Sequence, residues 1–554
     1  MEPRHGGKIL ADQLAIQGVE RVFSVPGESF LAALDGLYDS GIQNVVCRQE
    51  GGAAMMAEAH GKLTGQPGVL FVTRGPGATN ASSGIHVAMQ DSTPMVVFVG
   101  QIDIAHRDRE AFQEVDYKRL FSPLVKWVAE VDTTERLPEY IARAFQLARS
   151  GRPGPVVLAL PENMLSAQAT VPDRPKARIA SQTATNRDAH LIAKALSKAE
   201  KPLVIAGGSV WSAQAQMDLQ AFAAAWHLPV AVPFRRQDHI DNRHACYVGD
   251  LSVGMNPELA ALLAETDCLV VLGSRLGDIM TNGYTTLNPE AHGTRILHVH
   301  SDPDEPGHIY APDLAIAADS ASMVAQLGSL TPPTAPIWSG WRDAARRSYL
   351  DWQMPLETPG PVKMELVTTW LSDTLPDDAI LTNGAGNYAA FLHRYFRFKQ
   401  MHTQLAPTSG SMGYGFPAAI AAKLQHPDRD VICFAGDGCF QMTCNEMSTA
   451  IQHGAAVIVL VVNNGKYGTI RMHQEKIYPA RVSGTQIANP DFAALARSYG
   501  GWGATVTRTE DFESAFNEAK AAKTLAVIEL QLDDEVLSTG LSVSETRALG
   551  LGSG

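Results

Sequence analysis

The chain has 554 residues, which is too many for one hydrophobic core and favours roughly three or four domains. Apolar residues make up 45% and charged residues 19%, a composition that excludes a largely disordered chain. The formal net charge is −13 and no run rich in Lys or Arg is present, so neither a nucleic acid nor an anionic membrane is an expected partner.

The first seven residues are polar and lead directly into a helical pattern, so we expect no signal peptide. After them, short apolar strands alternate with Ala-rich helical stretches, which is typical of parallel sheets with crossover helices. The longest apolar run, residues 455–462, is too short to span a membrane. The expected strands form three groups: residues 69–73, 95–100 and 156–160; residues 203–206, 268–273 and 296–300; and residues 379–382, 431–435 and 457–462.

Two stretches of different composition separate these groups. Residues 169–188 are rich in Pro, Arg, Thr and Ala, and residues 331–361 hold several prolines and tryptophans around one short helical pattern. Both are interpreted as linkers. The sequence therefore predicts an α/β protein with three doubly wound parallel-sheet domains, over residues 1–170, 186–330 and 360–535. The six cysteines lie mostly in apolar segments without zinc-type spacing, so we expect reduced thiols in a cytoplasmic enzyme.

Glycine-rich turns follow several of the expected strands, where doubly wound sheets bind their ligands. Gly436-Asp437-Gly438 follows one strand, and Asn463-Asn464 follows the next, with 24 residues between Gly438 and Asn463. That length fits one helix and one parallel strand, so the two turns are expected to lie side by side. Oxygens of Asp437 and Asn464 could then bind one Mg²⁺, while the glycines let a diphosphate approach the backbone. Taken singly, Gly-Asp-Gly and Asn-Asn-Gly are also common turn tripeptides.

This pair of turns resembles the metal- and diphosphate-binding motif of thiamine diphosphate (ThDP) enzymes. The resemblance implies that Mg²⁺ is held by Asp437, Asn464 and the backbone carbonyl of Lys466. It further implies that Glu50, at the start of an Ala-rich helix, is the carboxylic acid that hydrogen-bonds the cofactor's pyrimidine ring. The alternative for Glu50 is a first-turn glutamate favoured by the helix dipole. Met412 occupies the place of the side chain that wedges between the cofactor's two rings, the alternative being a core methionine.

Further segments that could carry function are residues 75–80, 91–94, 100–101, 111–114, 126–127, 151–155, 161–162 and 415–419. Their order resembles that of acetolactate (acetohydroxyacid) synthase catalytic subunits, and the similarity covers residues 5–535. The resemblance implies pyrimidine-binding, central and diphosphate-binding domains, in that order. It also implies a homodimer or homotetramer, because Glu50 of one subunit would serve the cofactor anchored by its partner.

The implied reaction is decarboxylation of a 2-oxo acid, with pyruvate as the leading candidate, and ligation of the remaining fragment to a second carbonyl, giving a 2-hydroxy ketone such as 2-acetolactate. A role in branched-chain amino acid biosynthesis would accompany it. The candidate catalytic residues are Glu50, Glu28, Gln113, Lys126 and His473. The candidate cofactor-binding residues are Pro26, Gly75, Asn80, Gly386, Asn387, Ser411, Met412, Gly436, Asp437, Gly438, Cys439, Asn464, Lys466, Tyr467, Gly468 and Thr469.

Departures from the family pattern leave other functions open. Glu28 stands where the biosynthetic enzymes have small residues, which is more like 2-oxo acid decarboxylases. His473 replaces a tryptophan that favours a larger second oxo acid, and Arg74 replaces a small residue where a cation could hold an acidic group. Glu28, Gln113 and Lys126 could equally be surface residues. The alternatives are a decarboxylase or 2-hydroxyacyl-CoA lyase on the same scaffold, or a non-catalytic subunit.

The central domain is ambiguous in a different way. Biosynthetic acetolactate synthases bind FAD there, and residues 206–209, 273–278 and 300–302 are compatible with a nucleotide crevice. Arg235 and Arg236 could hold the diphosphate of FAD, ADP or coenzyme A, or lie in a solvated loop. FAD or another nucleotide is therefore an expectation that the sequence alone leaves open.

Overall fold

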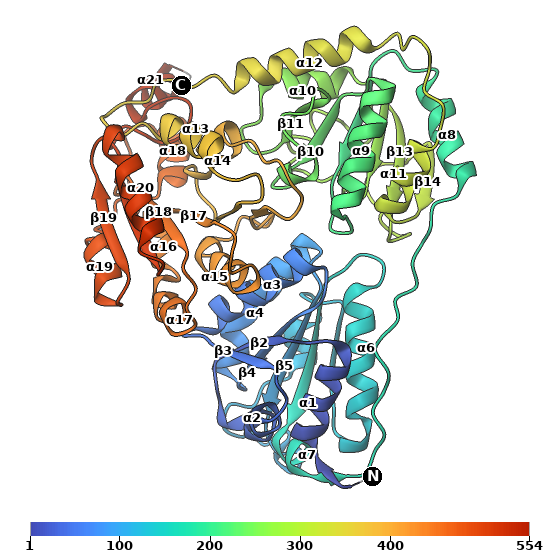
Figure 1. The fold of residues 1–554 in the computed structure, drawn as a ribbon, viewed down its shortest axis with the longest axis vertical. Coiled ribbons are helices and arrows are strands. Elements are labelled where there is room, and N and C mark those ends of the chain that lie inside the picture. The colour runs from blue at the N-terminus through green and yellow to red at the C-terminus, as the bar shows by residue number, and fades with distance from the viewer. Residues whose placement is uncertain (1, 553–554) are drawn as a thin grey trace.

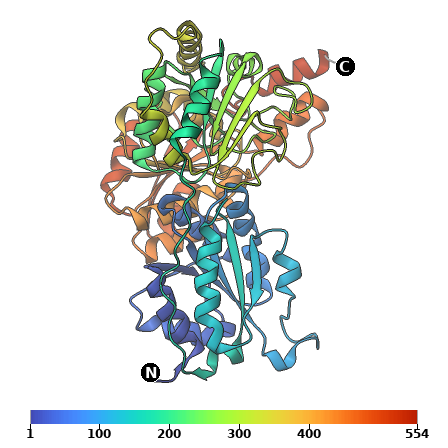
Figure 2. The same ribbon diagram turned by 90° about the vertical axis from the view of Figure 1, so that its right-hand side faces the viewer.

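The computed structural model describes residues 2–552 and contains three α/β domains (Figures 1 and 2). Each domain is built on a six-stranded sheet whose neighbouring strands are all parallel. The prediction of three doubly wound parallel-sheet domains is confirmed. A short antiparallel pair, β1 (Arg4–His5) with β8 (Gln168–Ala169), closes the N-terminal domain. No helix among the described residues is long and apolar enough to cross a membrane.

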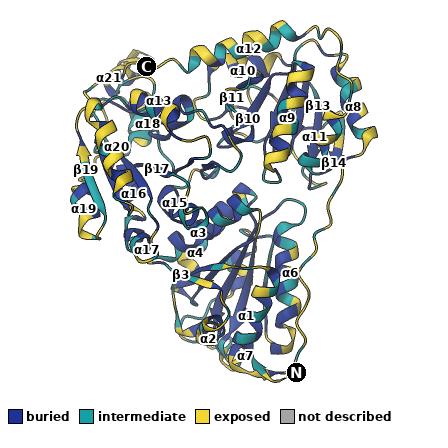
Figure 3. Cartoon of the chain, viewed as in Figure 1, coloured by how far each residue is buried: buried dark blue, intermediate teal, exposed yellow. Residues whose placement is uncertain are grey.

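The N-terminal domain has the strand order β3-β2-β4-β5-β7-β6. Helices α1, α2 and α6 cover one face of this sheet, and α3 and α4 cover the other. Strands buried on both faces read as unbroken apolar runs, and β4 and β5 are buried at every residue (Figure 3). The strands are β2 (Arg21–Ser24), β3 (Gln43–Val46), β4 (Gly68–Val72), β5 (Met95–Gln101), β6 (Trp127–Glu130) and β7 (Pro155–Pro161). The helices are α1 (Gly6–Gln17), α2 (Leu31–Tyr38), α3 (Glu50–Thr64), α4 (Pro76–Asp91), α5 (Tyr117–Phe121), α6 (Leu137–Arg149) and α7 (Glu162–Ser166).

The central domain has a different strand order, β11-β10-β9-β12-β13-β14. This is the order of doubly wound dinucleotide-binding folds, with the chain reversing direction between β9 and β12. An extended connection, residues 170–185, leads into it from the N-terminal domain (Figure 1). The strands are β9 (Pro202–Ala206), β10 (Val230–Pro233), β11 (Tyr247–Leu251), β12 (Cys268–Leu272), β13 (Arg295–His300) and β14 (Leu314–Ala317). The helices are α8 (Asn186–Leu196), α9 (Ala213–Trp226), α10 (Pro257–Glu265), α11 (Ser320–Gly328) and α12 (Ser339–Trp352).

The C-terminal domain repeats the topology of the N-terminal one, with the order β16-β15-β17-β18-β20-β19. Its chain reverses direction between β15 and β17. The strands are β15 (Ile380–Asn383), β16 (Gln404–Leu405), β17 (Val431–Gly436), β18 (Ile458–Asn463), β19 (Trp502–Val506) and β20 (Ala526–Gln531). The helices are α13 (Met364–Thr374), α14 (Ala389–Tyr395), α15 (Gly415–Gln425), α16 (Asp437–Gln441), α17 (Met447–Gln452), α18 (Gly468–Ile477), α19 (Phe492–Ser498), α20 (Phe512–Ala521) and α21 (Val543–Gly552).

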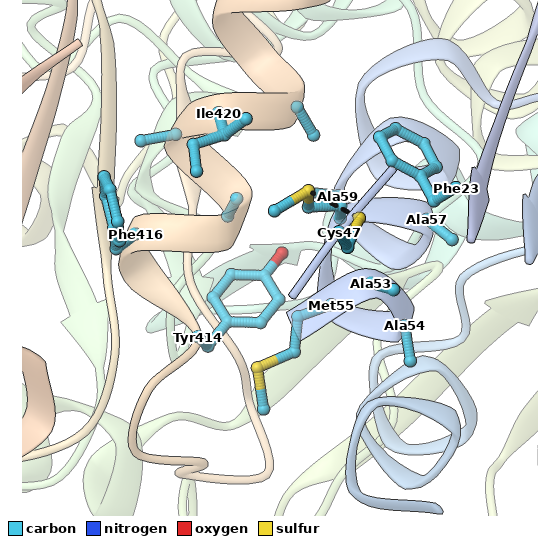
Figure 4. Close-up of a cluster of buried hydrophobic side chains, with 14 of the residues drawn as sticks. Phe23, Cys47, Ala53, Ala54, Met55, Ala57, Ala59, Tyr414, Phe416 and Ile420 are labelled. Carbon is cyan, nitrogen blue, oxygen red and sulfur yellow. Dashed lines mark hydrogen bonds between the residues drawn. The ribbon is translucent and has the colours of Figure 1, made fainter. Parts of the chain in front are cut away.

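The N- and C-terminal domains share one hydrophobic core, in which α3 packs against α15 (Figure 4). The small residues of both helices let their backbones approach closely, and the Tyr414 ring fills the space between them. Its hydroxyl group donates a hydrogen bond to the buried Glu58 carboxylate, which also accepts one from Thr93 at 2.6 Å. Lys62 pairs with Glu58 and Asp91 in the same buried network. The two domains are therefore fixed relative to one another within one chain.

The six cysteines are all free, and five of them are buried. Their burial agrees with the expectation that the thiols lie in apolar segments. Each of the nine expected strands is present within one residue of its predicted bounds, and each sheet contains three further strands.

Candidate functional site

A cavity of about 240 Å³ opens at the carboxyl ends of the C-terminal domain's strands, where the chain reverses between β15 and β17. Open α/β sheets bind ligands at this kind of place. Ser411 does not line the cavity, although both of its neighbours do. Twelve of the candidate cofactor-binding residues line it: Gly386, Asn387, Met412, Gly436, Asp437, Gly438, Cys439, Asn464, Lys466, Tyr467, Gly468 and Thr469.

Asp437 joins the two turns that the sequence placed side by side. Gly436 pairs with Val462 in the β17–β18 ladder, so both strands end at the same level of the sheet. The Asp437 carboxylate accepts hydrogen bonds from the N–H groups of Gly438 at 2.8 Å and Gly465 at 2.9 Å. The adjacency predicted from the spacing is thus present in the structure.

Glycine is required at both ends of the Gly-Asp-Gly turn because aromatic rings lie against its backbone. A Cβ at Gly436 would come within 2.7 Å of the Tyr388 ring, and one at Gly438 within 2.5 Å of the Tyr467 ring. Neither glycine has a positive φ, so their role here is close approach and not unusual backbone geometry. Any larger residue would displace a ring that lines the cavity.

The oxygen atoms at this turn fit a small divalent cation. Asp437 is buried, and burial raises the pKa of its carboxyl group above the ordinary value. Asn464 donates from Nδ2 to the Val536 carbonyl at 3.0 Å, while its Oδ1 accepts no hydrogen bond within residues 2–552. The described part of the chain has no cluster of three His, Cys, Asp or Glu side chains that could hold a metal. A cation here would therefore use one carboxylate, amide and carbonyl oxygens, and non-protein ligands, as Mg²⁺ commonly does.

Sequence reasoning missed several residues that shape this site. Asn489 donates from Nδ2 to both Asp437 and Asn463 at 2.8 Å, which braces the two turns from a third loop. Leu532, Val536 and Leu537 close the apolar side of the cavity from the segment after β20. Asn489 stands in a loop whose composition carries no binding signal, so only the fold reveals its role.

The candidate residues of the N-terminal domain gather at the corresponding edge of their own sheet. Glu50 is the first residue of α3, as expected, and its Oε2 accepts a hydrogen bond from Asn80 Nδ2 at 3.0 Å. Pro26 follows β2 and is exposed, while Gly75 follows β4 and is buried. Among the described residues, none of the N-terminal domain lines the C-terminal cavity. Within one chain, Glu50 and Asp437 therefore belong to separate sites.

A charged cluster occupies the reversal point between β2 and β4. The buried Arg74 guanidinium pairs with Glu162 at 2.9 Å and with Glu28 at 3.3 Å. The Arg74 Nε atom is also buried but has no hydrogen-bond partner among residues 2–552. With two acids and one base, this cluster has a formal charge of −1. Glu28 is exposed, as in the surface alternative, but it is held by an ion pair.

The other three catalytic candidates are dispersed. Gln113 packs against Gly75 and has a φ of 64°. Lys126 donates to the carbonyl oxygens of Leu147 and Ser150 at the C-terminal end of α6, and burial lowers its pKa to about 8. That geometry gives Lys126 a helix-capping role in this chain. His473 is exposed on α18 and does not line the cavity.

A second cavity, of about 260 Å³, lies at the reversal point of the central domain between β9 and β12. Its lining includes the turns after both strands and Arg236. Arg236 donates to the Asp91 carbonyl at 2.9 Å, and Arg235 bonds the Pro407 carbonyl. Both arginines are buried, so the solvated-loop alternative for them is wrong. They tie the central domain to its neighbours, and only Arg236 reaches the cavity.

Comparisons with known proteins agree with this architecture. Residues 4–120, 190–327 and 384–530 match the N-terminal TPP-binding, central and C-terminal TPP-binding domains of thiamine pyrophosphate enzymes. The chain is 31% identical over 518 residues to the acetolactate synthase isozyme 2 large subunit of Escherichia coli, covering 93% of both chains. It is 32% identical over 536 residues to the acetolactate synthase large subunit of Corynebacterium glutamicum, covering 93% of this chain and 84% of that protein.

A third relative is the isozyme 3 large subunit of Escherichia coli, 32% identical over 537 residues that cover 94% of this chain and 92% of that protein. The resemblance inferred from the sequence motifs is confirmed by these matches. The chain therefore belongs to the thiamine pyrophosphate enzymes, and within them to the relatives of acetolactate synthase large subunits.

Proposed function

We propose that this protein is a ThDP- and Mg²⁺-dependent carboligase of the acetolactate synthase type. It decarboxylates pyruvate and joins the remaining two-carbon unit to the carbonyl group of a second 2-oxo acid, giving a 2-hydroxy ketone such as 2-acetolactate. The observation that carries this proposal is the cavity whose lining brings together Asp437, Asn464, Lys466 and Met412. The similarity to acetolactate synthase large subunits over most of the chain supports the same reaction.

The roles of the chain's own residues follow from their positions. Asp437, Asn464 and the Lys466 carbonyl would hold Mg²⁺, and the cation would neutralise the diphosphate of the cofactor. When bound, the thiazolium ring of ThDP supplies the electron sink for loss of CO₂. Met412 and the apolar residues after β20 would exclude water from the rings, which strengthens electrostatic interactions in the cavity. Glu50 would hydrogen-bond the pyrimidine ring nitrogen.

We further propose a homo-oligomer in which Glu50 serves the cofactor of a partner copy. The support is that no described residue of the N-terminal domain lines the cavity of its own chain. The buried core between α3 and α15 holds the two domains in this arrangement, so closing the gap within one chain would require breaking it. A second copy could present Glu50 and Asn80 to the cavity without that cost.

The charged cluster favours one alternative, a 2-oxo acid decarboxylase or 2-hydroxyacyl-CoA lyase on the same scaffold. The exposed Glu28 carboxylate, held by Arg74, lies at the sheet edge that also carries Gly75 and Gln113. An acid near the reaction centre could supply the proton that replaces the lost carboxyl group, which would give an aldehyde in place of a carboligation product.

Pyruvate turnover distinguishes these reactions. Incubated with pyruvate, ThDP and Mg²⁺, the protein is expected to release CO₂ and 2-acetolactate, measured by NMR of the product mixture. Glu28→Gln, which keeps a hydrogen-bond acceptor for Arg74, is expected to leave 2-acetolactate as the main product. Acetaldehyde alone from the unaltered protein would contradict the carboligase proposal, and so would the absence of any reaction with pyruvate.

Cofactor retention tests the metal site. Asp437→Ala removes the only charged oxygen ligand, so the Mg²⁺-dependent affinity for ThDP is expected to fall more than ~100-fold. The measurement is a calorimetric titration with ThDP at saturating Mg²⁺. Asp430→Ala, whose carboxylate pairs with Lys520 on the surface next to the same strand, is the matched control and should bind normally. Undiminished binding by the Asp437 variant would show that the ligand assignment is wrong.

Proton exchange tests Glu50. Glu50→Gln is expected to keep ThDP and Mg²⁺ bound but to slow exchange of the cofactor's C2 proton on the order of 100-fold or more, because an amide has no acid proton to hold at the pyrimidine nitrogen. Deuterium exchange followed by NMR measures this rate. Glu513→Gln, which changes an exposed first-turn glutamate on α20, serves as control. An unchanged exchange rate in Glu50→Gln would remove Glu50 from the mechanism.

The central domain is proposed to bind a nucleotide, FAD being the first candidate and ADP or coenzyme A the alternatives. The support is the cavity at the β9–β12 reversal, where dinucleotide folds of this strand order bind their ligands. Acid-denatured protein should release the nucleotide for identification by chromatography. If none is released, and if none of the three raises the unfolding temperature when added, this part of the proposal fails.

A further inference from the structure

The turn between β3 and α3, which carries Glu50, is held from the C-terminal domain. The N–H groups of Arg48 and Gln49 donate to the Glu446 carboxylate at 3.1 and 3.0 Å. The N–H group of Val46 donates to His453 Nε2 at 3.1 Å, so the hydrogen bonds to the C-terminal domain already begin at the last residue of β3. These contacts reach across the domain boundary to the two residues that immediately precede Glu50.

Glu446 is positioned tightly in this contact. Its side chain is fully buried, and its second oxygen accepts a hydrogen bond from Thr449. Gly52, in the first turn of α3, leaves room for it, because a Cβ there would lie 2.7 Å from Glu446 Oε1. A carboxylate next to the N-terminal end of a helix is also favoured by the helix dipole. The turn therefore provides both the N–H donors and the space that the Glu446 carboxylate needs.

We propose that Glu446 is the positioning residue for Glu50. By fixing the N–H groups of Arg48 and Gln49, it sets where α3 begins and hence where the Glu50 carboxyl group stands relative to the cofactor. Glu446 itself lines no part of the cavity and touches no candidate ligand of the metal. The inference rests on the proposed function, since it gives Glu50 its role toward ThDP.

Glu446 also lies nine residues after Asp437 on the same chain. The segment that carries the proposed metal ligand thus also binds the backbone of the turn that precedes Glu50. If Glu50 serves a partner copy, the position of Glu446 in one chain determines proton exchange in the cofactor site of the other.

The test compares proton exchange with cofactor binding. In Glu446→Ala, the N–H groups of Arg48 and Gln49 lose their acceptor, so C2 proton exchange on bound ThDP should slow about tenfold or more. The dissociation constant for ThDP at saturating Mg²⁺ should stay within about threefold of the unaltered protein. Glu446→Gln keeps one side-chain oxygen for both N–H groups and should restore exchange to within about threefold. Thr449→Val is the control, because it removes the other partner of Glu446 and leaves the turn untouched.

A double variant shows whether Glu446 acts through Glu50. Added to Glu50→Gln, the Glu446→Ala change should slow exchange no further, because residues that act through one group are not additive. Gly52→Ala approaches the contact from the helix side and should also slow exchange; it gives the same test if Glu446→Ala does not fold.

The inference would be overturned by normal exchange in both Glu446→Ala and Gly52→Ala, or by a further loss when Glu446→Ala is combined with Glu50→Gln. A loss of exchange matched by an equal loss of ThDP affinity would also overturn it, because the effect would then lie in cofactor binding. Failure of the unaltered protein to bind ThDP or to exchange its C2 proton would instead contradict the proposed function.

Discussion

The rest of the site depends on the hydrogen bonds that the Asp437 carboxylate accepts. This carboxylate ties the turn after β17 to the turn after β18, and Asn489 braces the same carboxylate from a third loop. A buried carboxylate needs such partners, since an unpaired charge away from water is costly. Its two bonds to backbone N–H groups hold the strand ends at the spacing that a cation and a diphosphate would bridge. The aromatic rings against Gly436 and Gly438 allow no other residue there.

The topology of the three sheets determines where these hydrogen bonds and the other candidate sites lie. The outer two domains share one strand order and the central domain has another, yet each has one point where the chain reverses direction. The C-terminal reversal carries the proposed cofactor cavity, the central one carries a second cavity, and the N-terminal one carries the Arg74 cluster. The core between α3 and α15 fixes the outer domains in an arrangement in which the edge with Glu50 lines no part of its own chain's cavity. The proposed oligomer follows from that rigidity.

The sequence predicted those parts of the structure that a local residue pattern determines. Unbroken apolar runs predicted the central strands, and the spacing between Gly438 and Asn463 predicted neighbouring turns, since both are set by the geometry of parallel sheets. It did not predict the elements and side-chain roles that depend on a tertiary contact. Strand β20 was missed because Glu529 interrupts its apolar run, and hydrogen bonds from Asn463 at 2.7 Å and Thr505 at 3.2 Å make a buried acid acceptable there. The short edge strand β16 was missed because its two residues show no periodicity. The capping role of Lys126 likewise depends on a tertiary contact, with the Leu147 carbonyl 21 residues further along the chain.

Complementation between two inactive chains tests the central claim most directly. Co-expression of an Asp437→Ala chain with a Glu50→Gln chain, each carrying its own affinity tag, places both lesions in one site of the hybrid and leaves its other site intact. Random pairing makes half of the pairs hybrids, so about a quarter of the unaltered activity should return, and about half in the purified hybrid. Each variant alone should remain inactive. Purified hybrids without activity would show that Glu50 and Asp437 do not meet across two copies, and the account would be wrong.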